Sequence, residues 1–247
     1  MERWRQPGER LDALQRQGLY ILQKLEGFRF GMDAVLLAHF AAPRPGARVV
    51  DLGTGTGILP LLMGARTADA TFRAVELQPD MADMAARSVA MNGWQHRIQV
   101  YAMDWRDAPK ALGYGTADAV VCNPPYGKHG ATLINPDARL AAARHECEGT
   151  LTGAVASGAL LLRGKGRLAM VFPAPRLLEL LDAMRQHGLE PKRVRLVHQR
   201  VTAPPKLALA EAMKGVRPGL HWLPPLVLRD ETGRDTPELR KIYDETQ

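Results

Sequence analysis

An Asn-Pro-Pro-Tyr sequence at residues 123–126 directly follows a short apolar run at 119–122. The run is typical of a buried strand, and the two prolines end it because they have no N–H to donate to a strand ladder. Asn123 therefore carries an acceptor oxygen and a donor amide at a strand end, and the Pro124 carbonyl adds an acceptor. Tyr126 offers a flat aromatic face. This grouping is suited to hold an amino group by its hydrogens and to stack on the ring that bears it.

A second predicted strand, residues 48–52, runs into a glycine-rich turn with glycines at 53, 55 and 57, and a helix is expected from residue 58. Glycines let a backbone approach a ligand closely. The spacing differs from the Gly-x-Gly-x-x-Gly of dinucleotide sites, and Asp51 stands where it would repel a pyrophosphate. Asp51 suits a cationic amino-acid group instead. The pattern therefore favours S-adenosylmethionine over a nicotinamide cofactor.

Two further acids follow predicted strands. Glu76 ends the strand 72–76, where a carboxylate can accept from both ribose hydroxyls of a nucleoside. Asp104 follows the strand 97–101 and could accept from an adenine amine, with Trp105 packing on the ring. A solvated strand end or a turn would explain either acid alone. Their shared position at strand ends favours a cofactor site.

Predicted strands and helices alternate along the chain, which indicates an α/β fold with a doubly wound, mostly parallel sheet. The strands expected at 193–198 and 206–212 have no helix between them, so the last is predicted to be an antiparallel edge strand. We expect residues 1–45 to form an N-terminal extension or lid that packs on a core domain at 46–247. That extension is predicted to contain a hairpin of 19–22 with 28–30, and a helix at 33–40.

Composition sets the outer bounds. The chain has 247 residues, 46% of them hydrophobic, which suits one large α/β domain with a small extension. The absence of a long apolar run and the polar first residues predict a cytoplasmic protein that does not cross a membrane. The two cysteines have no metal-like spacing, so no metal site is expected. A net charge of +7 favours a polyanionic partner.

Asp51 with its glycine turn, Glu76 and the 123–126 motif together resemble the class I S-adenosylmethionine-dependent methyltransferases that methylate amino groups. The resemblance implies a Rossmann-like, seven-stranded, mostly parallel sheet with an antiparallel last strand and helices on both faces. In that superfamily the motif is shared by N6-adenine, N2-guanine and glutamine-N5 enzymes. It therefore indicates an amino nitrogen as acceptor and leaves the substrate open.

Further segments narrow the resemblance to the bacterial tRNA1(Val) (adenine-N6)-methyltransferase family, over nearly the full length of the chain. They are GERL at 8–11, GFRF at 27–30, DAVLLA at 33–38, ARHE at 143–146, KGVRPG at 214–219 and PPL at 224–226. The resemblance implies N6-methylation of a tRNA adenosine in the anticodon loop, adjacent to the anticodon. One departure is Gly127, where many relatives carry a second aromatic residue.

We expect three overlapping sets of site residues. The catalytic set is Asn123, Pro124 and Tyr126. The expected cofactor-binding set is Phe30, Asp33, Asp51, Gly53, Thr54, Gly55, Gly57, Glu76, Leu77, Asp104, Trp105 and Asn123. The expected RNA-binding set is Tyr126, Lys128, Arg195, Lys206 and Lys214.

Other acceptors stay open at this point: ribosomal RNA, a DNA adenine or a protein glutamine. A glutamine enzyme normally brings a helical N-terminal domain and a DNA enzyme a target-recognition domain, and the chain offers little room for either. A catalytically silent RNA-binding protein is the alternative from another class. We expect tRNA as partner, no metal and no membrane, and either a monomer or a homodimer.

Overall fold

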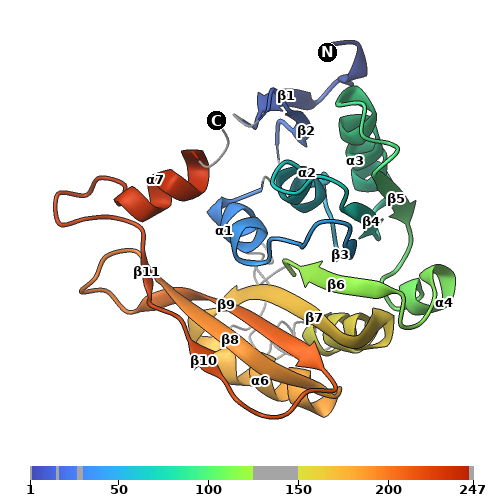
Figure 1. Ribbon diagram of the computed structural model, residues 1–247. Helices are drawn as coiled ribbons and strands as arrows, with labels where there is room; N and C mark the ends of the chain where they lie inside the picture. The colour runs from blue at the N-terminus through green and yellow to red at the C-terminus, as the bar shows by residue number, and fades with distance from the viewer. Residues whose placement is uncertain (1, 15–16, 27–29, 125–149, 245–247) are drawn as a thin grey trace, which may run out of the picture.

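The computed structural model describes residues 2–14, 17–26, 30–124 and 150–244, and these contain a nine-stranded sheet flanked by helices (Figure 1). The strand order is β10-β8-β9-β7-β6-β3-β4-β5, and β11 also pairs with β8. All neighbours are parallel except β9, which is antiparallel to both β7 and β8. The strands are β3 Arg48–Leu52, β4 Thr71–Glu76, β5 Ile98–Ala102, β6 Ala117–Cys122, β7 Leu162–Pro173, β8 Leu189–His198, β9 Pro205–Lys214, β10 His221–Trp222 and β11 Leu226–Val227.

Helices cover both faces of this sheet, as the doubly wound prediction requires. They are α1 Met32–Phe40, α2 Ile58–Gly64, α3 Pro79–Met91, α4 Ala108–Leu112, a helix over 150–161, α6 Leu177–Gln186 and α7 Pro237–Asp244, with short 3-10 turns at Glu2–Trp4 and Ala174–Arg176.

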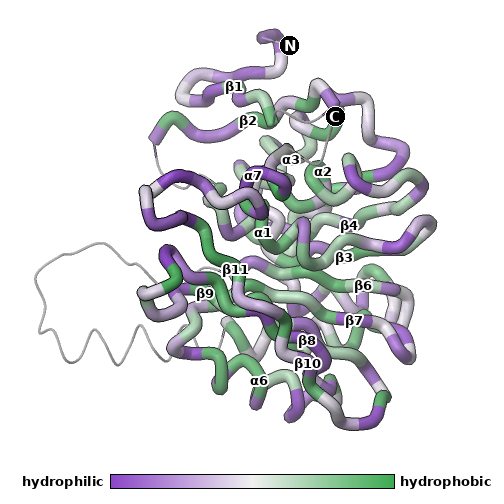
Figure 2. The backbone as a smooth tube through the Cα atoms, turned by 60° about the vertical axis from the view of Figure 1, so that its left-hand side comes forward, coloured by the Kyte–Doolittle hydropathy of each residue, from purple (hydrophilic) through white to green (hydrophobic). Residues whose placement is uncertain are grey.

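Alternation along the central strands separates two apolar cores, because successive strand residues face opposite sides of a sheet. Val49 and Val121 face the core shared with α1 and α2. Val50 and Cys122 face the core shared with α6 and the helix over 150–161. Figure 2 shows the hydrophobic segments running through these strands and the hydrophilic segments at the periphery.

The last long strand lies inside the sheet and not at its edge. β9 is antiparallel, as predicted, but it inserts between β7 and β8. The free side of β8 is taken by β10 and β11. The edge placement was therefore wrong, because strand pairing is set by contacts distant in sequence. Because of β10 and β11, the sheet has nine strands and not the predicted seven.

The N-terminal hairpin uses a different turn from the predicted one. β1 (Glu9–Ala13) pairs antiparallel with β2 (Tyr20–Lys24), so the partner of 19–22 is not 28–30. Gln17 and Gly18, both with positive φ, lie between these strands. The hairpin packs through β2 on α3, where the Leu22 N–H donates to the Ser88 hydroxyl at 3.0 Å. The helix expected at 33–40 is confirmed as α1, which packs on α2.

Candidate active site at the carboxyl edge of the sheet

Asp51 is a buried acid in β3, directly before the glycine turn, and its side chain is fully enclosed. Among the described residues, neither of its oxygens nor the Thr54 hydroxyl makes a hydrogen bond of ordinary geometry. Burial raises the pKa of Asp51 to about 7; Thr54 offsets part of this effect, and the negative charge of Glu76 adds to it.

An enclosed carboxylate is costly unless a donor or cation pairs with it. A positively charged hydrogen-bond donor bound beside Asp51 would offset this cost. The amino group on the methionine part of S-adenosylmethionine has this chemistry, so the residues present fit that cofactor.

The glycine turn is tied to the next strand and to Glu76. The N–H groups of Gly53 and Thr54 both donate to the Val75 carbonyl at 2.9 Å. The Gly55 N–H donates to Glu76 Oε2 at 2.8 Å, from a backbone with φ of +57° that favours glycine. The carboxylate of Glu76 thus anchors the glycine turn to the end of β4.

Glu76 also joins the turn to the next helix. Its Oε1 accepts from the Gln78 N–H at 2.9 Å, at the start of α3. A carboxylate has about four lone-pair sites, so two remain for ribose hydroxyls. The neighbouring Leu77 is 63% exposed, which leaves an apolar side chain open to a ligand at this edge.

Trp105 and Asp104 lie beyond β5. A Cβ added to Gly53 would lie 3.2 Å from Trp105 Cζ3, so the indole packs directly on the glycine turn. Asp104 accepts from the Arg106 side chain through both oxygens, and this pairing holds the pKa of Asp104 below its ordinary value. An adenine amine would have to share that carboxylate with Arg106, and its role in cofactor binding stays a prediction.

Asn123 follows β6, which is hydrogen-bonded to β3, so its backbone lies beside the glycine turn. Its Nδ2 donates to Asp33 Oδ2 at 3.1 Å, across ninety positions of sequence. A carboxylate only accepts, so the amide of Asn123 must turn its nitrogen towards Asp33 and its oxygen away. No local pattern in the sequence indicates this pairing. Pro124 is buried beside it.

Several predicted site residues contribute to other parts of the fold. Phe30 packs against the core that contains α1, and its N–H donates to the Gln23 side chain at 3.2 Å. Gly57 precedes α2 in a left-handed conformation. Tyr126 and Lys128 lie outside the described residues.

The predicted RNA-binding cations are dispersed and two of them are engaged. Lys214 Nζ donates to the carbonyls of Ala159 and Leu162 at 2.6 and 2.9 Å. Lys206 is exposed.

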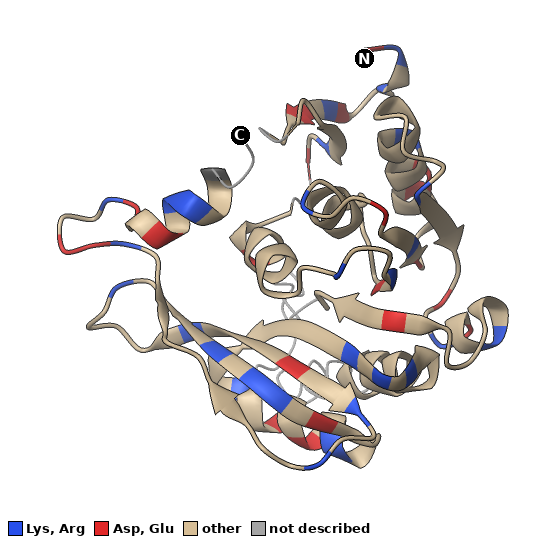
Figure 3. Ribbon diagram, in the orientation of Figure 1, with Lys and Arg blue, Asp and Glu red and all other residues tan. Residues whose placement is uncertain are grey.

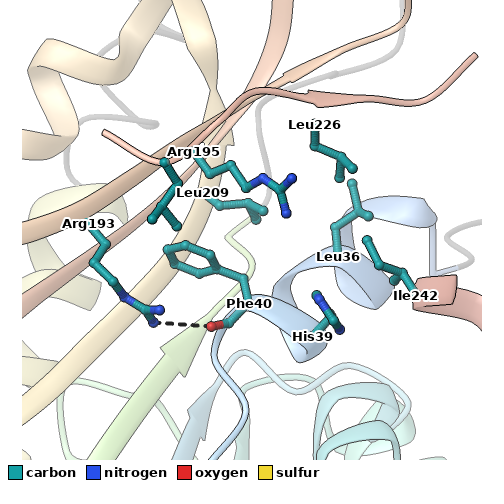
Figure 4. Close-up of a pocket in the computed structure, with 9 residues that line it drawn as sticks. Leu36, His39, Phe40, Arg193, Arg195, Leu209, Leu226 and Ile242 are labelled. Atoms are coloured by element: carbon teal, nitrogen blue, oxygen red, sulfur yellow. Dashed lines mark hydrogen bonds between the residues drawn. The ribbon is translucent and has the colours of Figure 1, made fainter. Parts of the chain in front are cut away.

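Arg195 lines a small pocket of about 170 Å³ between α1, β8, β9 and α7 (Figure 4). There it binds the Pro224 carbonyl and Glu238 at 2.9 and 2.6 Å. The neighbouring Arg193 binds Glu211 and the Phe40 carbonyl. RNA contacts by Arg195, Lys206 and Lys214 stay predictions.

Comparisons with known proteins agree with this geometry. Residues 31–152 match the model of the methyltransferase small domain family. A tRNA1(Val) (adenine(37)-N6)-methyltransferase from Tolumonas auensis is 34% identical over 88% of this chain and 89% of its own length. The chain belongs to this methyltransferase family. A second family member, from Parabacteroides distasonis, is 31% identical over 74% of this chain and 76% of its own.

Solved structures of low sequence identity share the fold of this tRNA1(Val) methyltransferase family member. A predicted O-methyltransferase from Agrobacterium tumefaciens superposes with a TM-score of 0.71 at 23% identity, covering 86% of this chain and 96% of its own. TrmN from Thermus thermophilus superposes with a TM-score of 0.57 at 20% identity, over 73% of this chain and 48% of its own. These likenesses establish the Rossmann-like architecture.

The described part of the chain shows neither a membrane span nor a metal centre. No helix there combines the length and apolar character needed to cross a bilayer. No cluster of three or more His, Cys, Asp or Glu side chains there is placed to hold a metal ion.

Proposed function

We propose that this protein transfers a methyl group from S-adenosylmethionine to the exocyclic N6 amine of an adenosine in the anticodon loop of a tRNA, beside the anticodon. The observation that carries the proposal is the neighbouring position of the enclosed Asp51 and the oriented Asn123 amide, at the ends of two adjacent strands. The names of the relatives in this family support tRNA and adenine as the substrate.

Different residues are assigned to the different parts of S-adenosylmethionine. When bound, S-adenosylmethionine supplies a methyl group already activated on a positively charged sulfur. Asp51 would pair with the amino group of its methionine part, and the backbone of the glycine turn at 53–57 would lie against that part. Glu76 would accept hydrogen bonds from the ribose hydroxyls, and Trp105 and Leu77 would border the base.

Asn123 prepares the acceptor amine. An adenine amine is a weak nucleophile because its lone pair is delocalised into the ring. Asn123 Oδ1 and the Pro124 carbonyl accept its two hydrogens, which allows the nitrogen to pyramidalise and to direct its lone pair at the methyl carbon. These contacts strengthen as positive charge develops on the nitrogen, so they favour the transition state over the ground state.

The remaining residues bring the two reactants together. From the sequence motif, we expect Tyr126 to stack on the base. Extruding that base costs little because an anticodon-loop base is already largely unpaired. The methylated nitrogen is acidic and loses its proton readily, so no strong general base is needed. The N-terminal extension of residues 1–45 supplies Asp33, which orients Asn123. The protein acts in the cytoplasm, where tRNA is processed.

The test is transfer of a labelled methyl group onto purified total tRNA, ribosomal RNA, DNA and protein, followed by nucleoside and amino-acid analysis. We expect label in tRNA as N6-methyladenosine. Label confined to ribosomal RNA, DNA or protein would contradict the proposed substrate. Absence of both transfer and S-adenosylmethionine binding by calorimetry would favour the catalytically silent RNA-binding alternative.

A further inference from the structure

A pocket lies at the amino edge of the sheet, opposite the candidate active site. It has a volume of about 490 Å³ and is bordered by the loop before β3 and by residues of β6, β7 and β9. Ligand sites commonly have volumes of a few hundred to a thousand Å³. β6 runs from Asp118 at this pocket to Asn123 at the other edge, a rise of roughly 16 Å.

The first acid in this pocket is shared by two arginines. Asp118 Oδ2 accepts from the Arg48 N–H at 2.8 Å and from the Arg48 side chain at 3.3 Å. Its Oδ1 accepts from Arg163 Nε. One carboxylate balances one of these two cations, so a positive charge remains.

The second acid is shared in the same way. Glu211 binds Arg167 at 3.4 Å and Arg193 at 2.8 Å. Burial lowers the pKa of Arg167, and the positive charges of Arg193 and Arg44 lower it further against the opposing effect of Glu211. The cations in this region therefore repel one another, and a bound anion would relieve that repulsion.

A bulge in β7 delivers further positive charge to the same place. Ala117 of β6 pairs with Leu162 of β7, whereas Ala119 pairs with Arg167, so β7 advances by five residues while β6 advances by two. Lys165, within this bulge, has a φ of +61°, a conformation that non-glycine residues rarely adopt. Bulges re-aim side chains, and this one directs Lys165 to the pocket.

From this geometry we propose that the pocket binds the phosphate group of a nucleotide. Arg44 and Lys165 are exposed and line the pocket beside the two shared acids. Arginine forks and lysine ammonium groups are the usual protein ligands of phosphate. Figure 3 shows that Lys and Arg segments are frequent over the β7–β8–β9 half of the sheet.

The phosphate has two candidate sources, the backbone of a bound tRNA or a free nucleotide. If the phosphate belongs to a bound tRNA, the inference rests on the proposed function. One RNA molecule would then contact both edges of the sheet. The free source does not depend on methyl transfer.

The test compares the wild type with Arg44→Gln/Lys165→Gln and with a control, Lys110→Gln/Arg185→Gln, that removes the same charge from α4 and α6. All four exchanges are at exposed positions, so both variants are expected to fold. Two probes are used: unmodified tRNA, titrated at 50, 100 and 200 mM NaCl, and inorganic pyrophosphate, followed by the shift of the melting temperature.

For a tRNA source we expect the pocket variant to bind tRNA about tenfold more weakly at 100 mM salt than the control. The slope of log Kd against log salt should fall by about one for each phosphate that the variant no longer binds. For a free nucleotide, we expect the pocket variant to bind tRNA as tightly as the control variant does. The rise in melting temperature on adding pyrophosphate should then disappear in the pocket variant alone. If both readouts match the control, the proposal is overturned. If the wild type fails to methylate tRNA, the proposed function is contradicted. The melting shift by pyrophosphate would still test whether the pocket binds phosphate.

Discussion

The two edges of one sheet carry opposite charge patterns. At the carboxyl edge, Asp51 is enclosed, and no cation of the described residues is bound to it. At the amino edge, Asp118 and Glu211 are each bound by two arginines. Asp51 at the first edge has no bound cation among the described residues, whereas the arginines at the second edge outnumber the two acids that they bind. The contrast indicates that the first is built to receive a cation and the second an anion.

Exposure to solvent also differs between Asp51 and the arginines that bind Asp118. Asp51 has its pKa raised to about 7 because it is enclosed, so a charge there acts strongly and at short range. The arginines around Asp118 are about half exposed, and salt therefore screens them. We expect substitutions at the carboxyl edge to have large, salt-independent effects, and those at the amino edge to have smaller effects that depend on salt.

The largest effect is expected from Asn123→Ala. Removing an acceptor that strengthens in the transition state should lower kcat for methyl transfer about 10³-fold. Cofactor binding should change little, because Asn123 acts on the acceptor amine. Single-turnover transfer and calorimetry with S-adenosylmethionine measure the two quantities, and near-normal turnover would remove Asn123 from the mechanism.

Asp51→Asn should come next. Loss of a buried charge pair is expected to raise the Kd for S-adenosylmethionine about 100-fold. Asp118→Asn makes the same chemical change at the opposite edge, and calorimetry should give it a wild-type Kd. Equal losses in the two variants would show that the contrast between the edges does not govern cofactor binding.

The pH dependence of cofactor binding sharpens the assignment of Asp51. The pKa of Asp51 is about 7, so below pH 7 its carboxyl group is mostly protonated in the free protein. Cofactor binding needs the charged form, so Asp51 must lose this proton when the cofactor binds. Affinity for S-adenosylmethionine should therefore fall by up to tenfold per pH unit between pH 7 and 5. Calorimetry across this range should show a flat profile for Asp51→Asn, and a flat profile in the wild type would contradict the assignment.

Asp33→Asn should give the smallest effect, a decrease of about fivefold in kcat. An asparagine at 33 can donate as well as accept, so the amide of Asn123 loses its fixed orientation. If Asp33 acts only by positioning the Asn123 amide, the Kd for S-adenosylmethionine and the KM for tRNA should stay unchanged. A raised cofactor Kd would assign Asp33 to the cofactor instead.

Local pattern was sufficient for most of the fold. The apolar runs around Asp51 and Asn123 correctly predicted strands, and the glycine turn correctly predicted the helix that follows it. These features act over a few residues, so one sequence displays them.

Contacts between distant segments could not be read in this way. The hydrogen bond from Asn123 to Asp33 joins segments ninety positions apart, and either residue alone looks like an ordinary polar side chain. The two glycines of residues 164–166 are typical of a helix end, yet this segment lies within β7, at the bulge. The two strands with which β9 pairs likewise lie in distant parts of the sequence, and local pattern does not identify them.

The insertion of β9 has a consequence for synthesis on the ribosome. β7 and β8 are made first, but they do not pair with each other, and the strand that lies between them, β9, is made last of the three. Until then, both strands have an unsatisfied side along which a second nascent chain could pair. Arrest of translation before β9 has left the ribosome should therefore yield an aggregation-prone intermediate, whereas a chain in which β9, β10 and β11 have all emerged should not.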